Sequence, residues 1–151
     1  MAKIVLKKNE GRTISSGGLW VFDNEIDYVD GTYINGDIVE VVSYKDDFIG
    51  YGYINDNSKI RVRILTRNKE DVIDDEFFIN RFKLAWNYRK KVIDTNCCRV
   101  VFSDSDRLPG LIVDLCINVL SKGFYNVCLN NVAMRIRQRL MKNLIGRQNM
   151  V

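Results

Sequence analysis

Short apolar-rich segments separated by turn-forming residues fill the first 70 residues, and this pattern restricts the fold more than any other feature of the sequence. Ser15–Gly18 and Asn35–Gly36 are typical of tight turns, because glycine and small polar residues tolerate the backbone angles that reverse a chain. The spacing predicts successive β-strands over Ile4–Lys7, Leu19–Phe22, Asp37–Val42 and Phe48–Ile54.

Two further features indicate that these strands close into a small barrel. Gly50 and Gly52 lie two residues apart on one strand face, which favours a tight barrel corner or the close approach of another backbone. The segment Lys59–Ile64 alternates between apolar and basic residues. This alternation places Ile60, Val62 and Ile64 inward and, on the outer face, Lys59, Arg61 and Arg63.

The second part of the chain has a different pattern. Residues 68–76 are polar and acidic and predict a linker whose last carboxylates begin a helix. Helical spacing between Phe77 and Ile93 predicts an amphipathic helix whose apolar positions are Phe78, Phe82, Ala85, Trp86, Val92 and Ile93. Two strands are then expected, Arg99–Ser103 and Leu111–Asp114, joined by a turn that contains Pro109.

These patterns divide the chain into three parts. Residues 1–70 form the barrel, and residues 71–115 form the linker helix and a hairpin. Residues 116–151 are a tail with basic and no acidic side chains, so the chain's formal charge of +4 arises there. Apolar residues at helical spacing between 129 and 144 predict a basic amphipathic helix in this tail.

Two motifs resemble a known family. Gly17–Ile26 (GGLWVFDNEI) resembles the opening of a PUA domain in bacterial class I S-adenosylmethionine-dependent methyltransferases that modify cytosine C5 of large-subunit ribosomal RNA. Val101–Asp114 (VFSDSDRLPGLIVD) resembles the stretch that follows that domain. The resemblance implies a mainly β fold with α: a PUA-like small β-barrel, then a helix and the start of a small α+β segment.

The resemblance covers roughly residues 1–115. Relatives often have His-Pro at Gly18–Leu19 and commonly glycine at Arg107. The family continues into a doubly wound domain that holds the cofactor and a catalytic cysteine, and no such domain is expected in these 151 residues. The chain thus resembles a methyltransferase truncated before its catalytic domain.

Catalytic, cofactor and metal sites are not expected in this chain, and whether it is an enzyme stays open. It has no histidine, and none of its cysteines has the two-residue separation that suits a zinc site. Asp104 and Asp106 are interpreted as turn residues that bond their own backbone. Cys97 and Cys98 are expected to be buried or half-buried thiols. S-adenosylmethionine belongs to the full-length family.

The predicted partner is RNA, ribosomal by the resemblance, because lysine and arginine side chains meet its phosphates. Lys59, Arg61 and Arg63 form either a phosphate-contacting stripe or merely a solvated strand face. A second basic group, Lys7, Lys8 and Arg12, lies near the turn at Gly17 and Gly18, where PUA-like domains are expected to approach RNA with backbone amides. Packing is favoured over base stacking for Trp20.

Two functions are compatible with these features. The first is the RNA-binding domain of a ribosomal RNA methyltransferase that lacks its catalytic domain, with a tail that follows from a shifted reading frame. The alternative is a free-standing PUA-type adaptor with a native basic helix at its carboxyl end. No apolar run reaches the ~20 residues of a membrane helix and no secretory signal is evident, so a cytoplasmic location is expected. A homodimer is left open.

Overall fold

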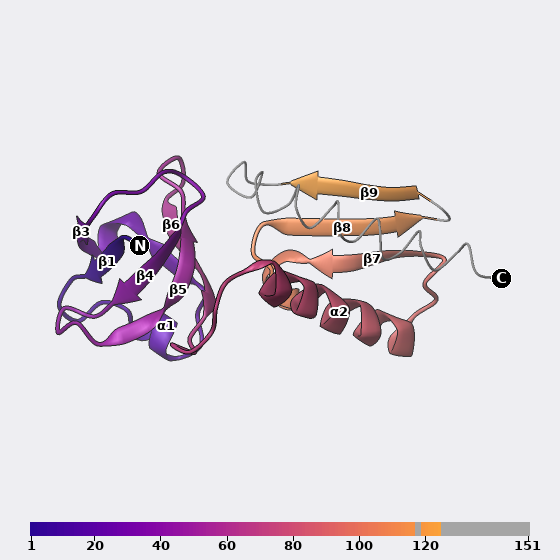
Figure 1. Ribbon diagram of the computed structural model, residues 1–151, viewed down its shortest axis with the longest axis horizontal. Coiled ribbons are helices and arrows are strands. Elements are labelled where there is room, and N and C mark those ends of the chain that lie inside the picture. Colours follow the sequence, from indigo (N-terminus) through magenta and orange to yellow (C-terminus); the bar gives the residue numbers. More distant parts are fainter. Residues whose placement is uncertain (117–118, 125–151) are drawn as a thin grey trace. The chain divides into compact units, whose positions relative to one another are not determined.

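The computed structural model of the chain describes residues 1–116 and 119–124. The chain divides into two compact units, Met1–Asp71 and Val72–Val151 (Figure 1). The division lies one residue beyond the sequence-based boundary at residue 70. Within the described ranges, no helix has both the length and the apolar character needed to cross a membrane.

The first unit is a curled sheet with two short helical turns (Figure 1). The strands pair in the order β2-β6-β5-β4-β1-β3, so β2 and β3 are the edges. The β1–β4 pair is parallel and the others are antiparallel. The elements are β1 Lys3–Leu6, α1 Arg12–Ser15, β2 Trp20–Phe22, η1 Asp23–Glu25, β3 Ile26–Asp30, β4 Ile38–Val42, β5 Phe48–Ile54 and β6 Ile60–Thr66. The predicted mainly β fold of this unit is confirmed.

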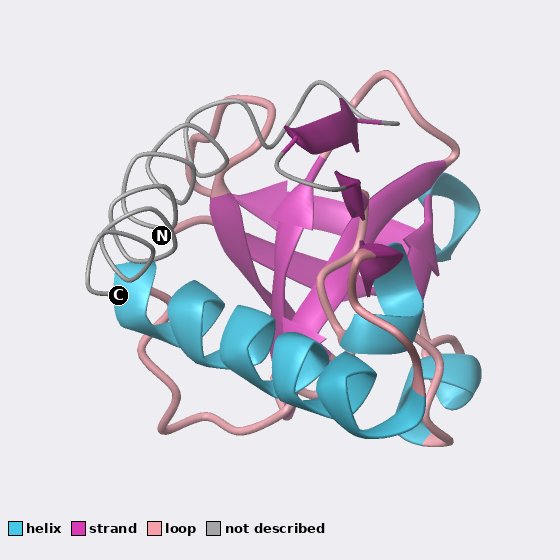
Figure 2. Ribbon diagram, turned by 90° about the vertical axis from the view of Figure 1, so that its right-hand side faces the viewer, coloured by secondary structure: helices cyan, strands magenta, loops and turns pink. Residues whose placement is uncertain are grey.

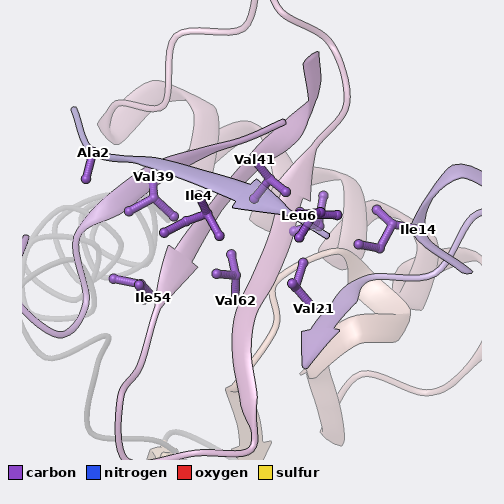
Figure 3. Close-up of a cluster of buried hydrophobic side chains, with 10 residues drawn as sticks. Ala2, Ile4, Leu6, Ile14, Val21, Val39, Val41, Ile54 and Val62 are labelled. Carbon is purple, nitrogen blue, oxygen red and sulfur yellow. The ribbon is translucent and has the colours of Figure 1, made fainter. Parts of the chain in front are cut away.

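The core of this unit is made of aliphatic side chains from nearly every element. Alternate residues of β1, β2, β4, β5 and β6 point inward, as the period of two requires. In Figure 3 these side chains point toward one another, and Ile14 of α1 lies beside Leu6 of β1. The short helical turn is therefore held by its one buried residue, which anchors the loop between β1 and β2. The cluster comprises Ala2, Ile4, Leu6, Ile14, Val21, Val39, Val41, Ile54, Val62 and Ile64.

The two glycines of β5 allow β6 to approach closely, as predicted. A β-carbon on Gly50 would lie 2.7 Å from the carbonyl oxygen of Thr66. One on Gly52 would lie 2.4 Å from the carbonyl oxygen of Arg63. Because both contacts are with backbone, no side-chain movement could relieve them, and the tight β5–β6 pair requires glycine at both positions.

The chain leaves β6 through a hydrogen-bonded turn. The Thr66 hydroxyl donates to Asp71 Oδ2 at 2.5 Å, and the Asn68 side-chain amide donates to Asp71 Oδ1 at 2.7 Å. Helix α2 (Asp75–Val92) then begins as expected from the acidic linker. Asp74 caps it, accepting a hydrogen bond from the backbone N–H of Phe77 at 2.9 Å.

The second unit contains α2, a single long helix (Figure 2), and an antiparallel sheet with the strand order β7-β8-β9. The strands are β7 Cys97–Phe102, β8 Leu111–Cys116 and β9 Val119–Phe124, and η2 (Ser103–Asp106) lies between the first two. The predicted hairpin is therefore present. The third strand lies within the segment interpreted as the tail, and the helix predicted for residues 129–144 lies outside the described residues.

An ion pair shielded from solvent connects α2 to the hairpin turn. Arg89 donates to both carboxylate oxygens of Asp106 at 3.0 and 2.6 Å, and their side chains are 14% and 10% exposed. Asp106 also accepts a hydrogen bond from the backbone N–H of Phe102, as expected of a turn residue. The sequence pattern identified the turn but not this longer-range arginine partner.

Several expectations for the second unit were wrong. Val92 is 53% and Ile93 47% exposed, although both were assigned to the apolar face of the helix. The buried residues of α2 are Phe78, Ile79, Phe82 and Ala85, all within its first three turns, and of these only Ile79 was not among the predicted apolar positions. Cys97 is exposed rather than half-buried, because it opens the edge strand β7.

Candidate nucleic-acid interface

The β2 edge of the first unit carries two exposed aromatic rings. Val21 points into the core, so its neighbours Trp20 and Phe22 share the opposite face of the strand. They are 43% and 39% exposed. The packing favoured for Trp20 from the sequence is therefore only partial, because 43% of the residue's surface is exposed.

Cations that are distant in the sequence meet at this edge. Arg63 of β6 is the direct partner of Trp20 across the antiparallel pair. The backbone carbonyl of Lys59 accepts from Asp23 N–H at 3.0 Å. The ammonium of Lys7 donates to the carbonyl of Asn24 at 2.8 Å. Thus Lys7 and Lys59 both lie beside η1, which follows β2 directly.

We refer to these five residues as the β2-edge surface: Lys7, Trp20, Phe22, Lys59 and Arg63. Lys7 and Lys59 are exposed, whereas Arg63 is half-buried and donates to the carbonyl of Ile60 at 3.3 Å. The exposed Asp23 carboxylate lies among them and accepts from the N–H of Asn24. Arg63 thus lies opposite Trp20, and the Lys7 ammonium lies beside η1, which follows Phe22.

Arg61, the middle residue of the predicted basic stripe, is committed to internal partners. Its Nη2 lies 2.7 Å from Asp56 Oδ1 and 3.1 Å from the hydroxyl of Tyr33. Tyr33 in turn donates to the same Asp56 oxygen at 3.0 Å. Neutralisation by Asp56 makes Arg61 a weaker candidate for phosphate contact than Lys59.

The turn at Gly17 and Gly18 is held by its own amides. Gly17 N–H donates to the carbonyl of Ile14 at 3.0 Å and Gly18 N–H to that of Thr13 at 2.7 Å. Both amides therefore already have acceptors within the protein. Gly17 has a φ of 114°, and a β-carbon there would meet no atom within 4 Å, so the surface is open at this point. Lys8 and Arg12 are exposed nearby in the sequence.

Arg67 is a positioning residue that sequence reasoning missed. Its Nε donates to the carbonyl of Ile14 at 3.2 Å, and its Nη2 donates to the carbonyl of Gly18. It thereby links the end of β6 to both sides of the Gly17–Gly18 turn. The only signal in the sequence was that Leu65, Thr66 and Arg67 could extend the strand expected to end at Ile64.

The opposite edge, β3, has the reverse charge. Asp27, Tyr28 and Asp30 are exposed along it. A hydrogen bond from the Lys3 ammonium to Asp46, 2.8 Å, raises the pKa of Lys3, and the charges of Asp46, Glu40 and Asp30 act in the same direction. The cation nearest this edge is thus surrounded by carboxylates. Among the described residues, no cluster of cysteine, aspartate and glutamate is arranged to hold a metal ion.

Comparison with known protein families identifies the family that the first unit resembles. Residues 4–67 match the family described as PUA-like domain. The first unit is a PUA-like domain. The match covers β1 to β6 and includes all five residues of the β2-edge surface. It ends at Arg67, the residue that holds the Gly17–Gly18 turn.

Relatives extend the similarity beyond the PUA-like domain. Ribosomal RNA large subunit methyltransferase I of Alteromonas mediterranea is 36% identical over 121 residues, covering 78% of this chain and 30% of the relative. The Shewanella frigidimarina protein of the same name is 34% identical over 149 residues, covering 95% of this chain and 36% of the relative. The expected resemblance to ribosomal RNA methyltransferases is confirmed, and the chain spans about a third of their length.

The second alignment also takes in residues beyond 115, where the sequence analysis ended its resemblance, because the first 115 residues cannot account for 95% of the chain. Among solved structures, a Streptococcus mutans protein assigned as a SAM-dependent methyltransferase matches with a TM-score of 0.76 at 18% identity, covering 94% of this chain and 38% of that one. A structure of a protein assigned as a methyltransferase, complexed with SAH, matches with a TM-score of 0.77 at 18% identity. These two similarities concern the fold.

Proposed function

We propose that the PUA-like domain binds RNA, that this RNA is ribosomal RNA of the large subunit, and that the chain is the RNA-binding part of a SAM-dependent methyltransferase. The observation that carries the proposal is that Lys7, Lys59 and Arg63 come from separate segments that all border β2 or η1, next to two exposed aromatic rings. The names of the relatives support the choice of RNA. The cytosine C5 specificity implied by the sequence resemblance belongs to the same proposal.

The residues present indicate which steps this chain would perform under the proposal. Exposed ammonium groups bind phosphates without reading sequence, and they position a nucleic acid rather than react with it. The described residues therefore supply binding and orientation, and S-adenosylmethionine supplies the methyl group in the full-length relatives. The S. frigidimarina alignment includes most of residues 116–151, so the tail that was attributed to a shifted reading frame aligns with this relative.

The proposal is tested by the salt dependence of RNA binding. The whole chain is titrated into a fluorescent RNA hairpin with a single-stranded loop, and anisotropy is measured between about 50 and 200 mM salt. The Lys7→Ala/Lys59→Ala variant should bind more weakly, and its slope of log affinity against log salt should fall by roughly 0.7–0.9 for each lost contact.

Lys3→Ala is the matched control, since it removes one lysine from the β1–β3 side of the same sheet, where carboxylates surround it. It should leave the slope unchanged. RNA binding that is absent in the unaltered chain, or a slope that the double variant leaves unchanged, would contradict the proposal.

A further inference from the structure

Trp20 and Phe22 form a pair of aromatic surfaces with a defined spacing. Side chains two residues apart on a strand lie on one face, about 6.5 Å apart. No strand follows β2 on its outer side in the order of the sheet. A flat ligand can therefore approach the rings from that side. Large aromatic side chains usually bury most of their surface, so this degree of exposure suits a contact with a partner.

The charges around the rings favour a nucleic acid strand as that partner. Arg63 lies across from Trp20, and Lys59 is next to Ile60, the partner of Phe22. A cation therefore lies across from Trp20, and an exposed lysine lies one residue from the partner of Phe22. A single strand offers a flat base and a phosphate at every step, so alternating aromatic and basic side chains match its chemistry.

The exposed rings also distinguish between paired and unpaired RNA. In a duplex the bases are stacked on one another, and its surface shows phosphates and 2′-hydroxyls. Such a surface gives Trp20 nothing to stack on, whereas an unpaired base has a free π-face. Tyr28 on the other edge strand, β3, is more exposed, at 56%, but the same strand carries the carboxylates of Asp27 and Asp30. The exposed fraction of a ring therefore does not by itself identify the base-binding site.

We propose that Trp20 stacks on an unpaired base of the bound RNA, with Phe22 as the adjacent stacking surface and Arg63 and Lys59 meeting the neighbouring phosphates. This inference rests on the proposed RNA binding and specifies the form of RNA that the domain recognises, a loop or bulge rather than a continuous duplex. In this arrangement Trp20 makes the ring contact, and the lysines contribute only the electrostatic part of the affinity.

Tryptophan fluorescence tests the contact directly. The chain has two tryptophans, and Trp86→Phe leaves Trp20 as the sole reporter. Trp86 lies in α2 of the second unit, so its removal leaves the β2-edge surface intact. A short oligouridine should quench the emission of Trp20 as it binds. A blunt RNA duplex of equal length, at a concentration that saturates anisotropy, should quench it far less.

Substitution gives a second, independent readout. Trp20→Ala should weaken oligouridine binding by roughly 5- to 150-fold, because base–aromatic stacking contributes about that much. Its affinity for the duplex should change by less than about twofold, since phosphate contacts carry that binding. Trp20→Phe should retain most of the affinity for oligouridine, and Trp20→Leu, which keeps apolar bulk without a ring, should not. Tyr28→Ala is the control at the opposite edge and should bind as the unaltered chain does.

The possible outcomes distinguish failure of the stacking proposal from failure of the proposed RNA binding. Salt-dependent RNA binding with unchanged Trp20 emission overturns the stacking proposal and leaves RNA binding in place. Equal losses on oligouridine and duplex in Trp20→Ala, or full binding by Trp20→Leu, also overturn it. The Trp20→Phe variant guards against misfolding, since it keeps a ring at the position. Absence of binding to every RNA in the unaltered chain refutes the proposed function itself.

Discussion

The two edges of the barrel sheet follow one another in the chain and yet differ in chemistry. β2 and β3 are separated only by η1, so residues 20–30 supply both edges. Each presents an exposed aromatic ring. At β2 the neighbours include Lys7, Lys59 and Arg63, whereas β3 itself carries Asp27 and Asp30.

The two edges therefore present exposed rings in opposite charge surroundings. The cations at β2 come from β6 and from the end of β1, so the sheet order creates the basic edge. The carboxylates at β3 come from the edge strand itself. An exposed edge strand is also open to unwanted pairing with other chains, and the charges of β3 discourage that pairing.

The largest expected effect comes from reversing the charge at β2. Lys7→Glu with Lys59→Glu should lower affinity for the RNA hairpin on the order of 100-fold at low salt, because like charges then face the phosphates. The mirror change, Asp27→Lys with Asp30→Lys, should raise affinity less than about tenfold. Anisotropy titrations compare the two. A gain at β3 as large as the loss at β2 would show that RNA responds to net charge alone and that the edges are equivalent.

A smaller effect is expected from Arg67→Ala. This change removes the two hydrogen bonds that hold Gly18 and the end of α1, and should cost about 1 kcal/mol of stability in this exposed setting. Amide exchange at Gly17 and Gly18 should accelerate more than at β3. RNA affinity should fall several-fold, because the segment leading into Trp20 loses its support. Arg67→Lys offers a single nitrogen in place of the two that bond Ile14 and Gly18, and should restore part of both effects. Unchanged exchange at these glycines would show that Arg67 does not position the turn.

The smallest effect is expected at Arg61. Arg61→Met removes a cation already paired with Asp56, so affinity for the RNA hairpin should stay within about twofold of the unaltered chain. Lys59→Met, which removes an exposed cation from the same strand, should weaken binding more. A larger loss for Arg61 than for Lys59, measured at equal salt, would restore the uniform stripe suggested by the sequence.

Sequence patterns predicted the strands that bury one face. β4, β5 and β6 alternate or carry strong turn signals, and the glycines of β5 correctly indicated a close backbone contact. β3 escaped notice because Asp27 and Tyr28 are adjacent exposed residues, which breaks the alternation. The four residues of α1 are too few to show helical periodicity, and only the packing of Ile14 explains their conformation.

The candidate surface was less predictable than the fold, since its residues are adjacent only in three dimensions. Alternation assigned Arg61 and Arg63 to one face, but it could not show that Asp56 and Tyr33 reach Arg61. A packed position was favoured for Trp20 because the sequence Leu-Trp-Val-Phe resembles a buried strand. Its exposure depends on β2 being an edge, and local sequence does not reveal strand order.

The pairing of β2 with β6 has a consequence for the order of events during synthesis. β1, β3, β4 and β5 can associate as soon as they leave the ribosome, but β2 has no partner until β6 follows, because Trp20 pairs with Arg63. Closing so long a loop delays this pairing relative to the local hairpins. A nascent chain that ends before β6 therefore exposes the rings without Lys59 and Arg63 beside them. The β2-edge surface, which we propose as the RNA-binding surface, is complete only when the last strand of the barrel is added.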